Sequence, residues 1–367
     1  MNKEIRENLQ QFWSDAYIKE CNKENKHHIF HLYQRVGKIK TTLNCIIKLK
    51  LNNPKILISY PDNQILTSWQ QDFVKFNYNS TNITFTNKQS LEKYVNSKFD
   101  IFIIDEIHNL SDNNYIYVNK IISNTSYVIG LSGTINKEKK QELYNTLGLK
   151  ILIEYNKEQA IKDNLISDYE IEIHLVKLDN KIQKKNSKDK LVTEKQSYDN
   201  FTYVINDLKS KGKDTFFMNI SRNKILQSSI SKQNKVKELL NILKDKRVLV
   251  FTGLTKTADS LGIPSFHSKS KNNNLIEFQN GVINHLAMAN MGGIGVSYYN
   301  LDCVILSNFT HDSAKTDQNN SRSMINDYEG KVSKIIIIST DEPLELKKLQ
   351  KSLLLYDSKK IKYFNNL

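Results

Sequence analysis

Short apolar runs rich in β-branched residues alternate with amphipathic stretches along the chain, and this alternation limits the possible folds more than any other feature. Runs of this length predict strands that are buried on both faces, and the stretches between them predict helices. The first part of the chain therefore predicts βαβ units around a parallel sheet, with strands at residues 29–32, 56–60, 101–104 and 127–131 and helices at residues 42–51 and 63–76.

The same pattern returns later in the chain, with predicted strands at residues 247–251, 286–290, 303–307 and 334–338 and helices at residues 232–243 and 273–278. A chain of 367 residues is long enough for two α/β domains, each with its own core. We expect the first domain at residues 1–160 and the second at residues 161–367. Residues 180–213 are basic and poor in apolar side chains, which predicts an insertion that is either helical or a mobile excursion.

The formal net charge of +14 predicts a polyanionic partner, because clustered Lys and Arg side chains release counterions from phosphates. No apolar run is long enough to span a bilayer, and the N-terminus has no apolar signal core. The three cysteines lie far apart, so neither a zinc site nor a disulfide framework is predicted. We therefore expect a cytoplasmic protein that binds nucleic acid and has no membrane partner, located in the host cytoplasm if the chain is viral.

Two adjacent carboxylates follow the strand predicted at residues 101–104. Asp105 and Glu106 stand directly at its end, and Ile107 and His108 come next. The carboxyl ends of parallel strands are where α/β folds bind ligands, so both acids are expected at a ligand site. In an ATPase the first acid holds Mg²⁺ and the second polarises the water that attacks the γ-phosphate of ATP. A solvated acidic turn is the alternative.

A basic turn lies between the first predicted strand and the first predicted helix, where a phosphate-binding loop is expected. Such a loop needs a lysine for the β- and γ-phosphates and a hydroxyl for Mg²⁺ at a helix N-terminus, and Lys40 and Thr41 supply them. Gly37 matches the earlier glycine of the pattern, whereas Ile39 stands where the second glycine belongs. With Lys38 as the phosphate lysine, Ile39 would stand where the hydroxyl is required, so the register with Lys40 and Thr41 is preferred. A basic turn without a ligand is the alternative.

Small polar residues follow other predicted strands. Pro61 and Asp62 open the second predicted helix, and Ser132 and Thr134 flank Gly133 at a strand end. Backbone amides and small hydroxyls at a helix N-terminus, as at Pro61 and Asp62, suit contacts to a sugar-phosphate backbone. The hydroxyl-bearing loop at Ser132 and Thr134 could instead hydrogen-bond the nearby carboxylates in one nucleotide state and release them in another. A plain helix cap at Asp62 and an isolated turn at Gly133 are equally compatible with the local sequence.

The second half contains three comparable elements. Thr252 and Gly253 follow the strand at residues 247–251. A glycine loop follows the strand at residues 286–290 and contains Gly292, Gly293 and Gly295. Closely spaced glycines let a backbone approach a ligand, although a flexible turn is the alternative. Later in the chain, Gln318 and Arg322 form a Gln-x-x-x-Arg element, whose arginine would otherwise be an ordinary surface residue.

Taken in order, these elements resemble the motifs of superfamily 2 helicases and translocases, and they extend from about residue 5 to about residue 340. The sequence Asp-Glu-Ile-His at residues 105–108 has the form of the DExH box of that superfamily. The short chain is similar to compact phage or viral helicases of the UvsW-like type. The resemblance implies two tandem RecA-like domains, each a mainly parallel sheet flanked by helices, with an ATP cleft between them. It also implies nucleic-acid-stimulated ATP hydrolysis and tracking along a nucleic-acid backbone, and the phage-like resemblance favours DNA over RNA, although the sequence leaves both open.

The resemblance assigns a role to each element. It implies that Gln10 reads adenine, with an ordinary amphipathic helix as the alternative, and that Arg322 and Gln318 complete the catalytic site from the second domain. Residues implied to bind ATP or its Mg²⁺ are Gly37, Lys38, Lys40, Thr41, Asp105, Gly293 and Gly295. Residues implied to contact nucleic acid are Pro61, Asp62, Ser132, Thr134, Thr252, Gly253 and Gly292. The chain has Ser321 and Ile325 where the family has a glycine and a second arginine, so Arg247 or a partner protein is a further source of an arginine finger.

Two other functions stay open on the sequence. A nucleic-acid-binding or loading factor with a degenerate helicase fold is favoured by Ile39 and Ile325, which depart from the family pattern. A nuclease that uses Asp105 and Glu106 is less favoured, because no further cluster of acids accompanies them.

Overall fold

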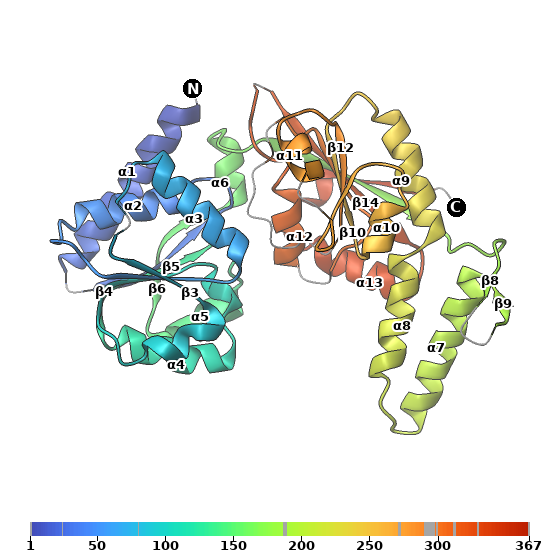
Figure 1. The fold of residues 1–367 in the computed structure, drawn as a ribbon, viewed down its shortest axis with the longest axis horizontal. Coiled ribbons are helices and arrows are strands. Elements are labelled where there is room, and N and C mark those ends of the chain that lie inside the picture. Colours follow the sequence, from blue (N-terminus) through green and yellow to red (C-terminus); the bar gives the residue numbers. More distant parts are fainter. Residues whose placement is uncertain are drawn as a thin grey trace. The chain divides into compact units, whose positions relative to one another are not determined.

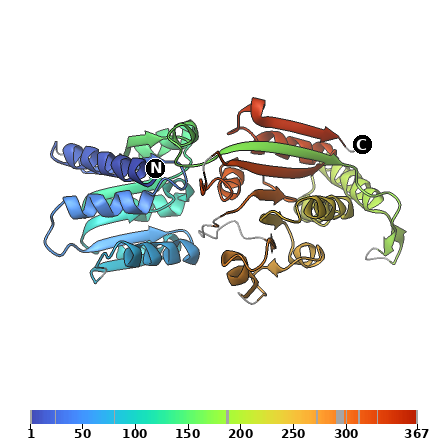
Figure 2. The same cartoon turned by 90° about the horizontal axis from the view of Figure 1, so that it is seen from above.

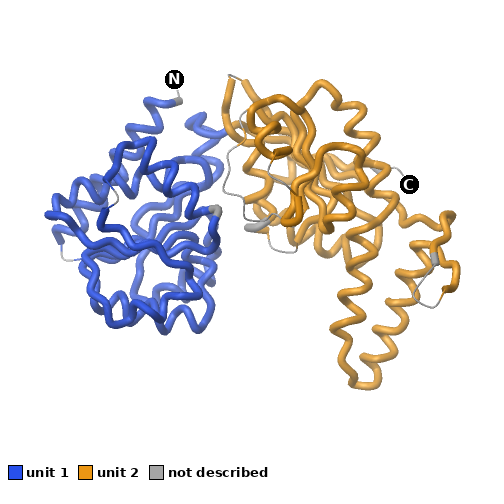
Figure 3. The backbone as a smooth tube through the Cα atoms, viewed as in Figure 1, with its two compact units in different colours: residues 1–166, 293–297 blue, residues 167–292, 298–367 orange. Residues whose placement is uncertain are grey.

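The structure is a computed structural model that describes residues 2–23, 25–79, 81–185, 189–270, 273–289, 298, 300–310, 313–328 and 330–365. The chain divides into two compact units (Figure 3), the first formed by residues up to Ile166 and the second by the described residues from Ser167 onward. Each unit has its own parallel sheet with helices packed against it (Figures 1 and 2). The predicted fold class is confirmed in this respect.

The first unit contains a six-stranded sheet in the order β3-β2-β4-β5-β1-β6, and all of its pairings are parallel. Its strands are β1 (His27–Leu32), β2 (Ile56–Tyr60), β3 (Ile83–Asn87), β4 (Phe99–Ile104), β5 (Thr125–Ser132) and β6 (Lys150–Tyr155). The apolar runs predict β1, β2, β4 and β5. The other two lie at the edges and are partly exposed, so they lack the continuous apolar run of a buried strand.

Helices cover both faces of this sheet (Figure 1). On one face lie α1 (Asn2–Cys21), α2 (Lys38–Lys48) and α3 (Asn63–Lys75), and on the other lie α4 (Asp112–Ile122) and α5 (Lys137–Leu147). Short helices complete the unit: η1 (Lys88–Tyr94), η2 (Ile107–Asn109) and α6 (Lys157–Lys162). Because the strands are parallel, the segments that follow β1 to β5 meet at one edge of the sheet.

The second unit contains a seven-stranded parallel sheet in the order β11-β12-β10-β13-β14-β7-β15. Its strands are β7 (Asp168–Val176), β10 (Val248–Thr252), β11 (Ser265–Phe266), β12 (His285–Ala289), β13 (Cys303–Leu306), β14 (Val332–Thr340) and β15 (Ile361–Asn365). The apolar runs predict β10, β12, β13 and β14, which are neighbours in the sheet. They do not predict β7, because Glu170 and Glu172 interrupt its apolar residues.

The helices of the second unit are α9 (Ile230–Ile242), α10 (Thr255–Asp259), α11 (Asn273–Gln279), α12 (Ser313–Asn320) and α13 (Pro343–Ser352), with η3 (Ser358–Lys360) before β15. Apolar side chains of α9 and α10 form one core with the sheet. A buried ion pair between Lys232 and Glu345 joins α9 to α13. Among the helices of the described ranges, none is long and apolar enough to cross a membrane.

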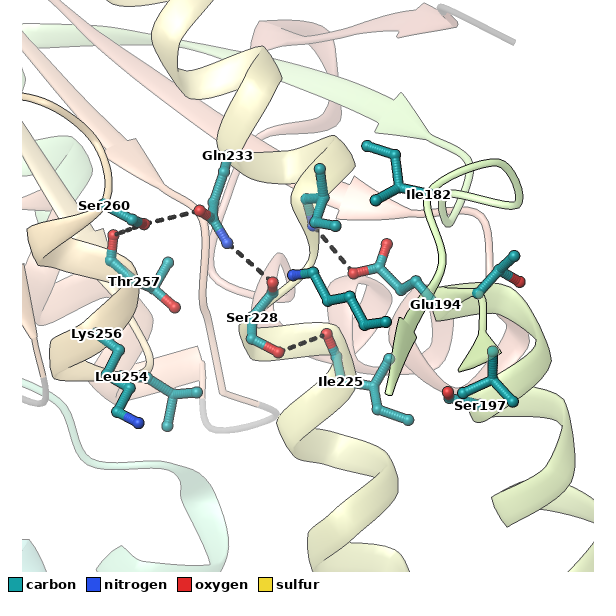
Figure 4. Close-up of a pocket in the computed structure, with 14 residues that line it drawn as sticks. Ile182, Glu194, Ser197, Ile225, Ser228, Gln233, Leu254, Lys256, Thr257 and Ser260 are labelled. Atoms are coloured by element: carbon teal, nitrogen blue, oxygen red, sulfur yellow. Dashed lines mark hydrogen bonds between the residues drawn. The ribbon is translucent and has the colours of Figure 1, made fainter. Parts of the chain in front are cut away.

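The predicted insertion contains a short antiparallel pair, β8 (Lys184–Lys185) and β9 (Leu191–Val192), and the helix α7 (Glu194–Ser210). This helix packs against α8 (Phe216–Gln227), and the two extend away from the sheet as a hairpin (Figure 1). An open pocket of about 520 Å³ lies at the base of the hairpin (Figure 4). There the Glu194 carboxylate accepts hydrogen bonds from the Ile230 backbone N–H and the Ser229 hydroxyl, which anchors the hairpin to α9.

Candidate active site

The acid pair lies at the carboxyl edge of the first sheet, directly after β4. Asp105 is buried, and its two carboxylate oxygens accept hydrogen bonds from the indole Nε1 of Trp69 and from the backbone N of Glu106, each at 2.9 Å. Burial and the neighbouring Glu106 carboxylate raise the pKa of Asp105, while Lys38, the Trp69 hydrogen bond and Lys88 act in the opposite direction. The carboxylate is thus held in a fixed orientation in a place where added positive charge would be favourable.

Glu106 adopts a left-handed backbone conformation, with φ of 47° and ψ of 52°. This conformation is costly for a residue other than glycine and persists only where surrounding contacts hold it. One carboxylate oxygen lies 3.8 Å from Nζ of Lys38, and the other lies 3.4 Å from Nδ1 of His108. The backbone carbonyl of Glu106 accepts a hydrogen bond from Nζ of Lys88 at 2.5 Å. Burial lowers the pKa of Lys88 to about 8, although Glu106, Asp105 and Asp62 attract its charge.

Lys38, and not Lys40, lies with the acid pair. Gly37 caps α2 with φ of 99°, so Lys38 is the first helical residue and its side chain reaches Glu106. The ammonium group of Lys40 lies instead 4.4 Å from the centre of the Phe76 ring. This geometry favours Lys38 as the phosphate lysine, which is the register that the preferred sequence interpretation set aside.

The same geometry bears on Mg²⁺. Thr41 is buried, and its hydroxyl donates to the Gly37 carbonyl at 3.1 Å, within the first turn of α2. Ile39, which follows Lys38, has no hydroxyl. In the part of the chain that the structure describes, no group of three or more His, Cys, Asp or Glu side chains is placed to hold a metal. Mg²⁺ commonly takes one or two carboxylates together with phosphate oxygens and water, so Asp105 fits as the protein ligand of a nucleotide-bound Mg²⁺.

Gln10 contacts the turn before α2, the candidate phosphate-binding loop. It is buried, and its Nε2 donates to the Val36 carbonyl at 3.0 Å. A Cβ atom added to Gly37 would lie only 2.0 Å from that same nitrogen, so a glycine is required there both for the left-handed conformation and for this close contact. The Gln10 side chain therefore contacts the loop that would hold the phosphates.

The segment after β5 lies next to both the acid-pair segment and the candidate phosphate-binding loop. The Ser132 hydroxyl lies 2.6 Å from Nδ1 of His108 and also bonds the backbone of Thr134. A Cβ atom added to Gly133 would lie 3.1 Å from Nζ of Lys38. One connected group of side chains therefore spans the segments after β1, β4 and β5.

Pro61 and Asp62 follow β2 at the same edge. Asp62 accepts a hydrogen bond from the backbone N of Ile65 at 3.1 Å, so it does cap α3. The Pro61 carbonyl accepts a hydrogen bond from Nδ2 of Asn87 at 3.2 Å. This turn is therefore connected to the end of β3.

The candidates of the second unit are less closely assembled. Thr252 and Gly253 lie at the end of β10, where the Thr252 hydroxyl donates to the Leu254 carbonyl at 3.1 Å. Gln318 is on α12, and its carbonyl accepts a hydrogen bond from the Ser321 hydroxyl at 2.9 Å. The predicted glycine loop, with Gly292, Gly293 and Gly295, lies outside the described residues.

Neither candidate arginine finger projects into solvent. Arg322 is only 1% exposed, and its guanidinium carbon lies 5.9 Å from the centre of the Phe251 ring. Its side chain would have to leave this position to contact a phosphate. Arg247 precedes β10, at the opposite edge of the sheet from Thr252, and its guanidinium group donates to the Phe278 carbonyl and stacks on the Phe278 ring. This position argues against Arg247 as a finger.

Sequence reasoning assigned no role to Trp69 or Lys88. A tryptophan in an amphipathic helix is normally a core residue, so nothing in the neighbouring sequence predicts its hydrogen bond to Asp105. Lys88 follows β3, which the apolar pattern does not predict, and a lysine among polar residues normally indicates an exposed turn. Only the packing of β3, β2 and β4 side by side brings Lys88 under the acid pair.

Comparisons with known proteins agree with this fold. Residues 3–137 match the family described as type III restriction enzyme, res subunit. The DNA 3'-5' translocase XPB2 of Sulfurisphaera tokodaii is 25% identical over 270 residues, which make up 66% of this chain and 59% of that protein. The chain therefore spans less than two thirds of the length of this relative.

Several solved structures show the same architecture at low identity. The ATP-dependent Type ISP restriction-modification enzyme LlaBIII bound to DNA has a TM-score of 0.63 at 13% identity, over 97% of this chain and 31% of that one. Dbp5 of S. cerevisiae bound to RNA and ADP BeF3 has a TM-score of 0.57 at 12% identity, over 92% of this chain and 85% of that one. The Pyrococcus furiosus Hef helicase domain has a TM-score of 0.50 at 14% identity, over 95% of this chain and 97% of that one.

These matches extend over both parallel sheets, which are therefore the tandem RecA-like domains of a helicase fold. In sequence over part of its length, and in fold over nearly all of it, the chain is similar to superfamily 2 helicases and translocases.

Proposed function

We propose that this protein is an ATP-dependent helicase or translocase that tracks along a DNA backbone and whose ATP turnover is stimulated by nucleic acid. The observation that carries the proposal is the connected group of Lys38, Glu106, His108 and Ser132 at the carboxyl edge of the first sheet. DNA is favoured over RNA because the relative XPB2 is named a DNA translocase and LlaBIII was solved bound to DNA, although Dbp5 was solved bound to RNA.

The residues of the first domain would divide the chemistry among them. Lys38 would leave Glu106 to bind the β- and γ-phosphates of ATP, and Glu106 would then be free to polarise the attacking water. Asp105 would hold Mg²⁺, which when bound supplies positive charge that neutralises the phosphate oxygens. His108 lies near both Glu106 and Ser132, so the segment at Ser132 and Thr134 would respond to the change at Glu106. Gln10 would hold the phosphate loop and read adenine beside it.

The remaining assignments follow from the superfamily and from the chemistry of each position. Gln318 and Arg322 would complete the catalytic site from the second domain after Arg322 leaves its buried position. Backbone contacts to nucleic acid would come from Pro61, Asp62, Thr252, Gly253 and Gly292, while Gly293 and Gly295 would approach the nucleotide. Contacts to phosphates rather than bases imply little sequence preference.

A second candidate is a nucleic-acid-binding or loading factor that keeps the helicase fold but turns ATP over poorly. Two observations favour it: Ile39 leaves the phosphate lysine without a following hydroxyl, and Arg322 is buried. The two candidates differ in one measurable quantity, which is the rate of ATP hydrolysis.

The deciding experiment measures ATP turnover alone and with single-stranded DNA, duplex DNA, branched DNA and RNA. We expect stimulation, largest with DNA, and a loss of about 10²-fold or more in Glu106→Gln. Glu138→Gln, which changes an exposed acid on α5, is the matched control and should turn over ATP normally. Absence of stimulated turnover in the unmodified protein would eliminate the motor and leave the loading factor.

A further inference from the structure

Asn87 and Lys88 connect the turn at Pro61 with the acid pair at Glu106, although neither residue belongs to those two motifs. Asn87 ends β3 and its side-chain Nδ2 donates to the Pro61 carbonyl at 3.2 Å. Lys88, the next residue, is 5% exposed, and its Nζ donates to the Glu106 carbonyl at 2.5 Å. One side chain therefore holds the turn proposed to contact nucleic acid, and its neighbour holds the proposed catalytic acid.

The sheet places this dipeptide between its two targets. β2 pairs with β3, where Tyr60 lies opposite Asn87, and β2 also pairs with β4, where Ser59 lies opposite Ile104. The ends of the three strands are therefore neighbours at one edge. The dipeptide is also held from outside, because Oδ1 of Asn87 accepts from the Gln89 backbone and Nδ2 of Asn114 donates to the Lys88 carbonyl, each at 3.0 Å.

The contact from Lys88 falls where the backbone is under strain. Glu106 has a left-handed conformation with φ of 47°, so the orientation of its peptide depends on partners that hold it. A buried lysine without a partner is costly, and Lys88 is attracted by the carboxylates of Asp62, Asp105 and Glu106 while it bonds the carbonyl. A shift of Lys88 would reorient the Glu106 peptide and with it the carboxylate.

We propose that Asn87 and Lys88 form the link by which nucleic acid bound at the Pro61 turn sets the position of Glu106 and so stimulates ATP turnover. The inference rests on the proposed function and adds two positioning residues to it. Displacement of the Pro61 carbonyl would move Asn87, and Lys88 would follow because adjacent Cα atoms are only about 3.8 Å apart. Nucleic acid would thereby act on the acid from within the first domain.

Two substitutions separate the ends of this link. Asn87→Asp keeps the oxygen that accepts from the Gln89 backbone and removes the donor to Pro61. Lys88→Met keeps a long apolar stem and removes the donor to Glu106. The matched controls are Asn96→Ala and Lys93→Met, which change exposed residues of the same segment.

The measured quantity is the ratio of ATP turnover with single-stranded DNA to turnover without it. We expect Asn87→Asp and Lys88→Met each to lower this ratio by about fivefold or more, the usual lower size of a coupling between sites. DNA affinity, measured by fluorescence anisotropy, should change far less than the ratio. The double variant should lose no more than the more affected single variant, because both residues lie on one path.

Three outcomes would overturn the link. A purely structural role would lower the melting temperature and both rates in proportion, which leaves the ratio unchanged. Independent, additive losses in the double variant would show that the two residues do not act together. If Lys88→Met does not fold, an unchanged ratio in Asn87→Asp is sufficient to reject the link. If nucleic acid does not change the ATP turnover of the wild-type protein, the proposed function is overturned, and this inference with it.

Discussion

Lys38 and Lys40 are two residues apart on the first turn of α2, yet their ammonium groups have different surroundings. Lys38 lies 3.8 Å from Glu106, whereas Lys40 lies over the Phe76 ring. Successive positions on a helix point about 100° apart, so the residue at which the helix begins decides which lysine faces the sheet edge. Gly37, in its left-handed conformation, sets that beginning at Lys38.

Lys38→Ala should therefore lower ATP turnover by about 10²-fold or more, because a positioned charge on the phosphates is removed from the transition state. Lys40→Ala, the matched control, should keep turnover within about twofold. Steady-state ATP hydrolysis at saturating nucleic acid measures both. If Lys40→Ala loses more ATP turnover than Lys38→Ala, Lys40 and Thr41 would be the residues that bind phosphate and Mg²⁺, as the sequence interpretation preferred.

Trp69 would act on the proposed Mg²⁺ site through its hydrogen bond to Asp105. Trp69→Phe keeps most of the buried ring and removes the donor. We therefore expect about tenfold weaker Mg²⁺ binding, as for other groups that orient a metal ligand, so the variant should need more Mg²⁺. The readout is the Mg²⁺ concentration that gives half-maximal ATP turnover. Trp13→Phe, at the other tryptophan, is the control, since Trp13 packs against Tyr155 away from the acid pair. Equal Mg²⁺ requirements in both variants would refute this role.

At the scale of elements, the site depends on contacts that join separate strands. His31 on β1 is an example: its Nε2 accepts a hydrogen bond from the backbone N of Ile135 at 3.2 Å, and its Nδ1 lies 3.3 Å from Glu154 on β6. Burial lowers the pKa of His31, and Glu154 only partly opposes this. The neutral ring thus connects β1, the segment after β5 and β6.

This connection predicts acid sensitivity. The pKa of His31 is lower in the folded state than in the unfolded state, so the unfolded state binds more protons once the pH falls below about 6.5. Stability should therefore be lost as the pH falls from about 7 through the folded-state pKa of His31, which lies below its usual value of about 6.5. His31→Gln can still accept the hydrogen bond but does not titrate, so its melting temperature should fall less over that range. Parallel pH profiles for the two proteins would contradict the assignment.

Whether a strand could be predicted from the sequence depends on whether it forms a continuous apolar run. β2 is buried along its whole length and reads as one apolar run, so it was predictable. β3 contains threonines at alternate positions and lies at the sheet edge, and β7 carries Glu170 and Glu172, so neither has that run. Missing β3 had a consequence for the site, because Asn87 and Lys88 come from its end.

At the scale of the whole molecule, charge is the property that matters most. The formal net charge of +14 is spread over two domains that resemble nucleic-acid motors. Because binding is proposed to involve phosphates, each neutralised phosphate releases counterions. Affinity for DNA should therefore depend strongly on salt and weakly on sequence.

We expect DNA affinity to fall by more than about tenfold when NaCl rises from about 50 to about 200 mM. Fluorescence anisotropy with two unrelated oligonucleotides of equal length measures the salt slope and the sequence preference together. The two oligonucleotides should give the same slope. Affinity that is insensitive to salt, or that differs greatly between the two sequences, would indicate base recognition instead.

The sequence by itself determined the two α/β domains and the place of Asp105 and Glu106 at a strand end, because buried strands and turn-borne acids leave local patterns. Only the tertiary structure decided that Lys38 faces Glu106, that Trp69 holds Asp105, that Lys88 lies beneath the acid pair and that Arg322 is buried. These facts depend on contacts between residues far apart in the chain, and on where a helix begins. A single sequence records neither.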